Sequence, residues 1–147
     1  MGHDLLELDR KAHELMSAGM AAEASEIFRM IVDRQPDWEH GQGFYCLACC
    51  QEDLGQLEQA EKYFRAALEF EPQNDIFLGG IASFLYLHGN AGDAFEAYLE
   101  LLAVETKFGF NEGTKRAMIG LKTLGERLGL SEAEMIQRTE AKLAARG

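Results

Sequence analysis

The chain has 147 residues, of which 47% are hydrophobic and 27% charged, so it is long enough for one domain with a real core. A net charge of −11 argues against a surface that neutralises phosphates, and we expect no nucleic-acid binding. The longest apolar stretches fall far short of the roughly 18 residues of a membrane span, and the start lacks the basic and apolar segments of a secretory signal. We therefore expect no membrane span and a cytoplasmic protein.

The charge is distributed unevenly along the chain. Residues 1–106 carry 20 acidic and 6 basic side chains, whereas residues 107–147 carry 5 acidic and 8 basic ones. Between Arg65 and Lys107 there is no lysine or arginine. Such asymmetry is common on solvated acidic surfaces, and it also suits a basic partner, so both interpretations stay open at the level of sequence.

Eight helices are expected in chain order. Glycines mark the end of the first helix of a pair, Pro36 and Pro72 follow the second, and the capping box Ser131-x-x-Glu134 precedes the last. The chain has only 2 prolines, so long helices are not interrupted and an all-α protein is predicted. The expected ranges are 3–17, 21–34, 40–54, 57–70, 74–88, 91–105, 111–128 and 132–145.

Three columns of residues recur in one register. A period near 34 residues indicates paired helices stacked in an array. The two extra residues between the first and second copies are expected in a loop within 37–43. The columns consist of a glycine, an alanine and a large aromatic residue with spacings of 36 and 34 residues: Gly19, Gly55 and Gly89; Ala24, Ala60 and Ala94; Phe28, Phe64 and Tyr98.

The middle copy resembles the tetratricopeptide repeat (TPR). The resemblance implies a right-handed superhelical TPR array of three helix-turn-helix repeats, near 5–38, 41–74 and 75–106, within one domain spanning 1–147. A C-terminal capping helical hairpin over 107–147 would close the array. The glycines would end helices in the left-handed conformation, and the aromatic column would fill the space between stacked pairs. The matching residues are Phe44-x2-Leu47-Ala48-x2-Gln51, Leu54-Gly55, Ala60-x3-Phe64-x2-Ala67-Leu68 and Glu71-Pro72.

The cysteines form the one pattern that could bind a metal, Cys46-x2-Cys49-Cys50. A structural zinc site needs about four ligands, usually in two spaced pairs, and His13 is the only residue that could be added. Cys49 near His13 is also the only candidate for nucleophilic catalysis, but no third residue to orient the histidine is evident. We predict free thiols, no metal, no cofactor and no enzymatic activity.

In TPR proteins the first helix of each pair lines the concave face, so the resemblance implies a peptide-binding groove here. Tyr45 and Tyr86 are the leading candidates for contact with a partner polypeptide. The expected groove residues are Leu6, Asp9, His13, Met16, Tyr45, Cys46, Cys49, Glu52, Ile76, Ser83, Tyr86 and Leu87. One TPR subclass binds the C-terminal carboxylates of cytosolic chaperones with lysine, arginine and asparagine side chains. At the matching positions this chain has Asp9, His13, Cys46, Ile76 and Gly80 instead, so we do not expect it to bind that class of partner.

The third copy, over residues 77–90, is similar to the corresponding repeat of the small acidic TPR chaperones that hold translocator proteins for bacterial type III secretion. That resemblance implies an apolar groove for an extended segment of a partner protein. That family usually carries a helical extension before its first repeat, which is used in dimer contacts, whereas here the first repeat begins by about Leu5. The resemblance therefore does not support a homodimer by that route, and the oligomeric state stays open. A generic scaffold or assembly adaptor is the alternative, and the C-terminal hairpin would either cap the array or occlude its groove.

Overall fold

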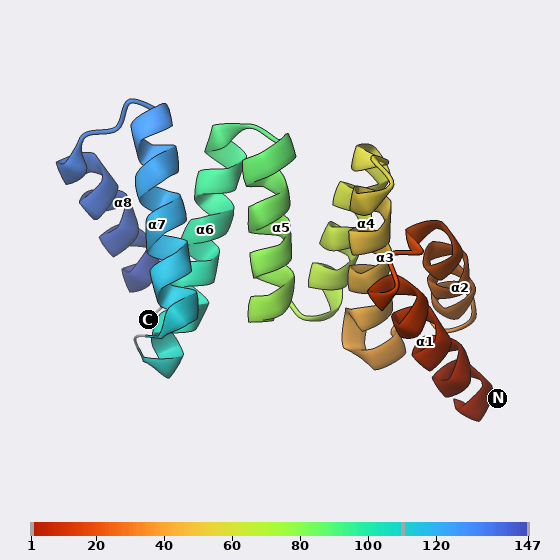
Figure 1. The fold of residues 1–147 in the computed structure, drawn as a ribbon. Coiled ribbons are helices and arrows are strands. Elements are labelled where there is room, and N and C mark those ends of the chain that lie inside the picture. The colour runs from red at the N-terminus through yellow and green to blue at the C-terminus, as the bar shows by residue number, and fades with distance from the viewer. Residues whose placement is uncertain (1, 110, 147) are drawn as a thin grey trace. The chain divides into compact units, whose positions relative to one another are not determined.

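The computed structural model describes residues 2–109 and 111–146, and α-helices make up most of this part of the chain (Figure 1). The described residues contain no β-strand, and no described helix is long and apolar enough to cross a membrane. Every predicted helix end agrees to within two residues, so the all-α prediction is confirmed. The helices are α1 (Gly2–Ser17), α2 (Ala21–Arg34), α3 (Gln42–Asp53), α4 (Leu57–Phe70), α5 (Asp75–His88), α6 (Ala91–Glu105), α7 (Glu112–Arg127) and α8 (Glu132–Arg146).

The helices group into two compact units. The first unit, Met1–Pro72, holds α1 to α4, and the second, Gln73–Gly147, holds α5 to α8. The boundary follows Pro72, one of the two prolines that end an outer helix. The function of residues 1–147 as a single domain stays a prediction.

Two of the three repeat glycines end their helices in the expected way. Gly19 and Gly55 have φ of +78° and +76°, and the amide after each closes the helix with a bond to the carbonyl five residues back. The prediction is wrong for Gly89, whose backbone is extended at φ −101° and ψ −162°. There the link to the next helix is short, because Asn90 immediately caps α6 by accepting from the Asp93 amide at 2.8 Å. Gly89 is needed for space instead, since a Cβ atom would lie 2.8 Å from the Leu85 side chain.

The insertion between the first two repeats forms a 3-10 turn, Trp38–Gly41, and not the first turn of the helix expected from residue 40. Glu39 and His40 both have positive φ, at 48° and 56°, which an α-helix does not accommodate. The buried Trp38 indole beside them donates from Nε1 to Asp9 Oδ1 of α1 at 3.2 Å. The insertion thus fastens the first helix of the array to the start of α3.

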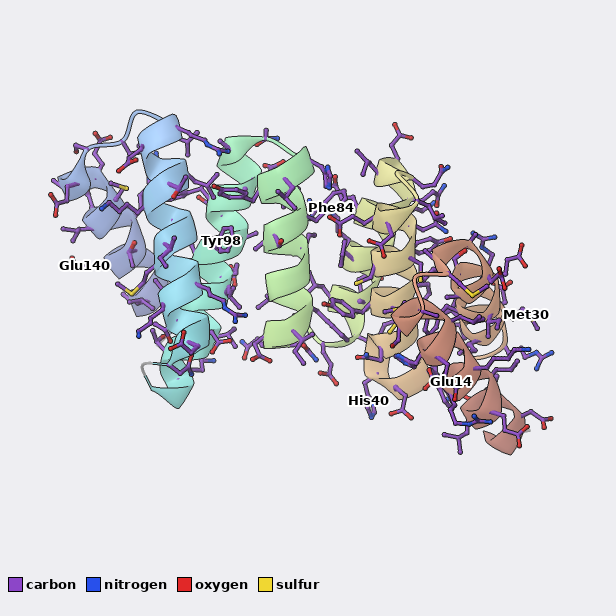
Figure 2. All side chains as sticks on the ribbon, in the orientation of Figure 1. Glu14, Met30, His40, Phe84, Tyr98 and Glu140 are labelled. Carbon is purple, nitrogen blue, oxygen red and sulfur yellow. The ribbon has the colours of Figure 1, made fainter. Side chains whose placement is uncertain are left out.

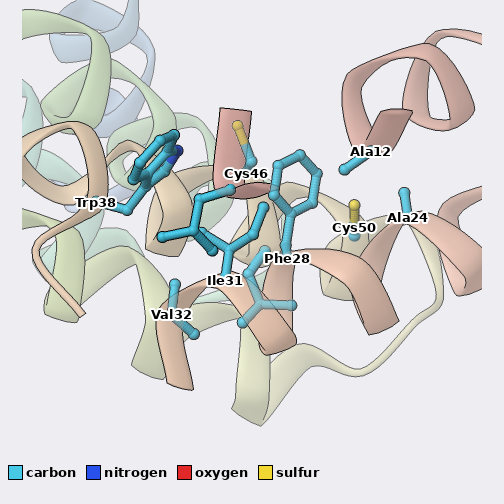
Figure 3. Packing of buried hydrophobic residues seen from close by; sticks show 10 residues of the cluster. Ala12, Ala24, Phe28, Ile31, Val32, Trp38, Cys46 and Cys50 are labelled. Carbon is cyan, nitrogen blue, oxygen red and sulfur yellow. The ribbon is translucent and has the colours of Figure 1, made fainter. Parts of the chain in front are cut away.

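The core of the first unit joins its two repeats (Figure 3). Ala12 and Ala24 are fully buried, which lets α1 and α2 approach closely. Phe28 of α2 lies in the same cluster as Cys46 and Cys50 of α3, so it fills the space between neighbouring helix pairs as the repeat pattern predicts.

The second unit packs three helices closely and adds a fourth at its edge. Gly120 of α7 leaves room for the ring of Tyr98 on α6, because a Cβ atom there would lie 3.0 Å from the ring (Figure 2). The predicted capping box before α8 is confirmed, with the Glu134 amide donating to Ser131 Oγ at 3.1 Å and the Ser131 amide donating to Glu134 Oε1 at 3.2 Å. At the opposite end of this hairpin, the Lys142 amine of α8 pairs with Glu100 of α6 at 2.6 Å.

Candidate partner-binding faces

The first face lies on α1 and α3 in the first unit. It carries seven of the twelve expected groove residues: Leu6, Asp9, His13, Met16, Tyr45, Cys49 and Glu52. Leu6 is 57% exposed, and the others are partly buried. The two helices meet here because His13 of α1 reaches Cys46 of α3, with 3.9 Å between Nε2 and Sγ. A partner would meet one exposed aliphatic side chain among half-buried polar and aromatic ones.

Asp9 organises the polar part of this face. Its Oδ1 accepts from Trp38 Nε1 at 3.2 Å and lies 3.4 Å from His13 Nε2. The His13 ring in turn stands edge-on to Phe28, with 5.3 Å between centroids. These contacts hold both side chains in place, which lowers the entropy lost when a partner binds to them.

Cys46 differs from the other expected groove residues because its side chain is only 1% exposed. It lies beneath the face, where the Gln42 amide is 3.5 Å from its sulfur. Burial raises the pKa of the Cys46 thiol to about 12, and the neighbouring Cys49 raises it further. Burial likewise raises the pKa of Cys49 to about 11. Both groups are therefore neutral thiols near pH 7.

The geometry does not form a catalytic triad. The sequence paired Cys49 with His13, whereas the structure places Cys46 next to that histidine. Both Asp9 and Cys46 approach the same ring nitrogen, Nε2, so the carboxylate does not orient the imidazole from its other side as a base requires. Among the described residues, no group of three or more His, Cys, Asp or Glu side chains could hold a metal ion.

Tyr45 lies partly under the first face. Its ring meets Phe64 of α4 edge-on, with 5.8 Å between centroids, and its hydroxyl is hydrogen-bonded to Cys49. Burial, followed by the nearby Cys49, raises the pKa of the Tyr45 phenol, so it stays protonated and able to donate. Since the ring packs on a core phenylalanine, Tyr45 contributes to stability as well as to the face.

The second face lies on α5 and α7 in the second unit. Ile76 and Leu87 of α5 are 59% and 64% exposed, and Ser83 lies exposed between them in the sequence. Tyr86 is partly buried, and its ring stands perpendicular to that of Tyr98 at 6.4 Å. This face therefore offers two exposed aliphatic side chains beside a fixed aromatic ring.

Arg127 of α7 completes the second face and was missed by the sequence analysis. Its guanidinium lies 4.8 Å from the centre of the Tyr86 ring, and its Nη2 is 3.4 Å from the tyrosine hydroxyl. The two residues are 41 positions apart in the sequence, and the repeat spacing does not predict a contact between them. Arg127 therefore adds a cation from α7 to the second face.

The comparisons with known proteins agree with this architecture. The tetratricopeptide repeat family model matches residues 41–74. Residues 41–74 are a tetratricopeptide repeat. This match confirms the prediction made from the middle copy, which contains the unbroken pattern from Phe44 to Pro72. No curated protein sequence matches the chain significantly.

Three solved structures share the fold. The Yersinia enterocolitica type III secretion chaperone SycD, in complex with a peptide of the translocator YopD, is 17% identical with a TM-score of 0.77, over 85% of this chain and 95% of that one. SycD in a second structure is 18% identical with a TM-score of 0.75, over 88% and 89%. A type III secretion complex from Aeromonas hydrophila gives 21% and 0.78, over 89% and 87%. At these identities the likeness establishes a shared all-α TPR fold, as predicted.

Proposed function

We propose that this protein is a non-enzymatic, cytoplasmic TPR chaperone of the type III secretion kind, which holds a segment of a client protein through exposed apolar side chains. The observation that carries the proposal is the exposure of Leu6, Ile76 and Leu87 on inner helices, where a TPR protein contacts its partner. Large aliphatic side chains exposed beside fixed aromatic rings are typical of a surface that a partner covers. In this proposal residues 1–147 act as one domain.

The likeness to SycD favours a translocator as the client. The SycD structure contains a peptide of YopD, so a chain with this fold can hold a translocator peptide. The two faces suit an apolar segment better than a C-terminal carboxylate. At three positions where carboxylate-binding TPR proteins have basic or amide residues, this chain has Asp9, His13 and Ile76. Burying the side chains of Ile76 and Leu87 against a client would contribute about 3 kcal/mol or more.

Charge plays a smaller part in the proposed complex. Residues 1–106 carry 20 acidic and 6 basic side chains, and Asp9 and Glu52 lie on the first face. Such a field speeds the encounter with a basic client more than it tightens the complex. We therefore expect that raising the salt from roughly 50 to 500 mM slows association of a purified client and leaves most of the affinity.

The test begins with the client itself. The tagged protein is expressed in its native host, the polypeptides that co-purify are identified by peptide mapping, and the client is purified for calorimetry. Ile76→Ser with Leu87→Ser should weaken its binding at least about 100-fold, since two aliphatic contacts are lost. Leu54→Ser with Leu57→Ser is the matched control, because these exposed leucines lie at the turn between α3 and α4 and belong to neither face.

Two outcomes would contradict the proposal. If the α5 variant bound its client as tightly as the control, the second face would not be the binding site. If the client were a stable, already folded subunit of a larger assembly, the protein would be a scaffold or adaptor and not a chaperone. A chaperone should instead keep its client in solution when the two are expressed together, and the α5 variant should lose that effect.

A further inference from the structure

Arg127 of α7 carries a charge that the apolar contacts of the second face do not use. Within the described part of the chain, its guanidinium forms no ion pair with a carboxylate. Glu126, its neighbour in the sequence, lines a groove between α6, α7 and α8 instead. A guanidinium has five N–H donors, and here only Nη2 is directed at a protein acceptor, the Tyr86 hydroxyl, at 3.4 Å. Since Arg127 is exposed, its other donors are open to a partner.

Two tyrosine rings hold the guanidinium in place. The Tyr86 ring lies beneath it, with 4.8 Å between the guanidinium carbon and the ring centre. Tyr98 of α6 supports Tyr86, because the two rings stand perpendicular to each other at 6.4 Å. The Tyr98 ring, labelled in Figure 2, also fills the space over Gly120 of α7, where a Cβ atom would lie 3.0 Å from it. Arg127 therefore loses less freedom on binding a partner than an unsupported surface arginine would.

A carboxylate is the group that fits a guanidinium held in this way. The planar guanidinium can stack on a ring through its face while its edge donates two parallel N–H bonds to one carboxylate. Helices α5 and α6 supply no lysine or arginine, because none occurs between Arg65 and Lys107. Leu87, which is 64% exposed, directly follows Tyr86 in α5. The cation and this aliphatic side chain thus lie at the same end of α5 and can contact one client segment.

We propose that Arg127 selects a client segment with an aspartate or glutamate side chain within about three residues of the aliphatic residue that packs on Leu87, since three extended residues span about 10 Å. This selectivity rests on the proposed function, because it requires a client on the second face. The acidic side chains of residues 1–106 do not oppose it, since salt screens exposed charges beyond about 8 Å and the contact depends on the nearest cation. The client is then recognised by one acidic residue as well as by apolar ones.

Selection from a library of short random peptides tests the charge preference. The peptides are fused to a phage coat protein through their C-termini, so only side chains supply carboxylates. On the full wild-type chain, aspartate or glutamate should be enriched near an aliphatic residue. On Arg127→Glu, lysine or arginine should be enriched at that place, because the preferred charge reverses. Arg138→Glu is the matched control and should select the same peptides as the wild type, because that guanidinium also lies over a ring, Phe95 at 6.0 Å, but belongs to α8 and not to the second face.

Calorimetry with a synthetic peptide gives the magnitude. The strongest acidic peptide is made with an amidated C-terminus, and a second form carries the side-chain amide in place of the selected carboxylate. The amide form should bind the wild type at least about 10-fold more weakly, since a charge-assisted contact is lost. With Arg127→Gln the two peptides should differ less than about threefold. Arg127→Lys should give an intermediate difference, because it keeps the charge and loses the planar fork.

Three results would overturn this assignment. Peptides that require Ile76 and Leu87 but show no acidic preference would exclude it and leave the proposed function standing. The same acidic preference on Arg127→Glu as on the wild type would do likewise. If no selected peptide lost affinity for the variant Ile76→Ser with Leu87→Ser, the proposed function would fail and the role of Arg127 with it. Because Arg127 and Arg138 are both exposed, their variants should melt near the wild-type temperature, so lost binding would not reflect unfolding.

Discussion

Replacing Phe28 by alanine would remove a large, fully buried side chain from between the first two helix pairs. The ring is fully buried, packs edge-on against His13, and belongs to the cluster that contains Cys46 and Cys50 of the next pair. Truncating a buried phenylalanine costs about 3–5 kcal/mol. A unit the size of Met1–Pro72 has a stability of about 4–11 kcal/mol at the usual value per residue. The variant should therefore lose much of that stability, and its melting temperature should fall by about 12–40 °C.

Trp38 makes the measurement specific to the first unit. It is the only tryptophan of the chain, and it is buried in the same cluster as Phe28. Its fluorescence during urea unfolding reports on this unit, whereas circular dichroism reports on all helices. Phe70→Ala is the matched control, because that ring is 40% exposed and stacks on Phe44 at 6.0 Å, so about 1 kcal/mol or less should be lost. A loss below about 1 kcal/mol for Phe28→Ala would refute the packing described here.

Three further predictions concern other parts of the molecule. Burial, together with the neighbouring Asp75, raises the pKa of Glu105, so its contribution to stability is present at acid pH and is lost as the pH rises through the folded-state value. Glu105→Gln should therefore raise the melting temperature more at pH 8 than at pH 4, and an equal effect at both pH values would count against this cause. Because burial raises the pKa of the Cys46 thiol to about 12, Cys46 should react slowly with a thiol reagent at pH 7 in the native protein and rapidly once unfolded, whereas a fast native reaction would show that it is accessible. Deleting residues 131–147 should not tighten client binding, because Lys142 holds α8 to α6 and not to the face of α5; tighter binding would mean that the hairpin occludes that face.

The sequence predicts most of the fold because the signals that end its helices are local. Gly19 and Gly55 adopt the left-handed conformation that the repeat requires, and Pro36 stops α2 through the extended Gln35 before it. Gly89 shows the limit of that reasoning. It occupies the same repeat column, but the cap at Asn90 imposes an extended backbone, and the glycine is needed for its small size.

The sites were harder to predict because their contacts link distant positions. A spacing of three residues on a helix places Cys46 and Cys49 near each other, but it does not tell which of them meets His13 on another helix. The contact of Arg127 with Tyr86 likewise depends on how α7 packs, and α7 lies outside the repeat pattern. Whether the twelve expected groove residues contact a client stays a prediction.

The turn at Trp38–Gly41 has a consequence for how such a chain can vary in length. Its two left-handed residues, Glu39 and His40, have exposed side chains, while the indole of Trp38 between them and α2 is buried and donates to Asp9 of α1. The number of residues in this turn therefore does not determine how the helices on either side of it pack. Extra residues could be accommodated here without shifting the helices on either side, which makes this turn a natural place to introduce a tag or a probe.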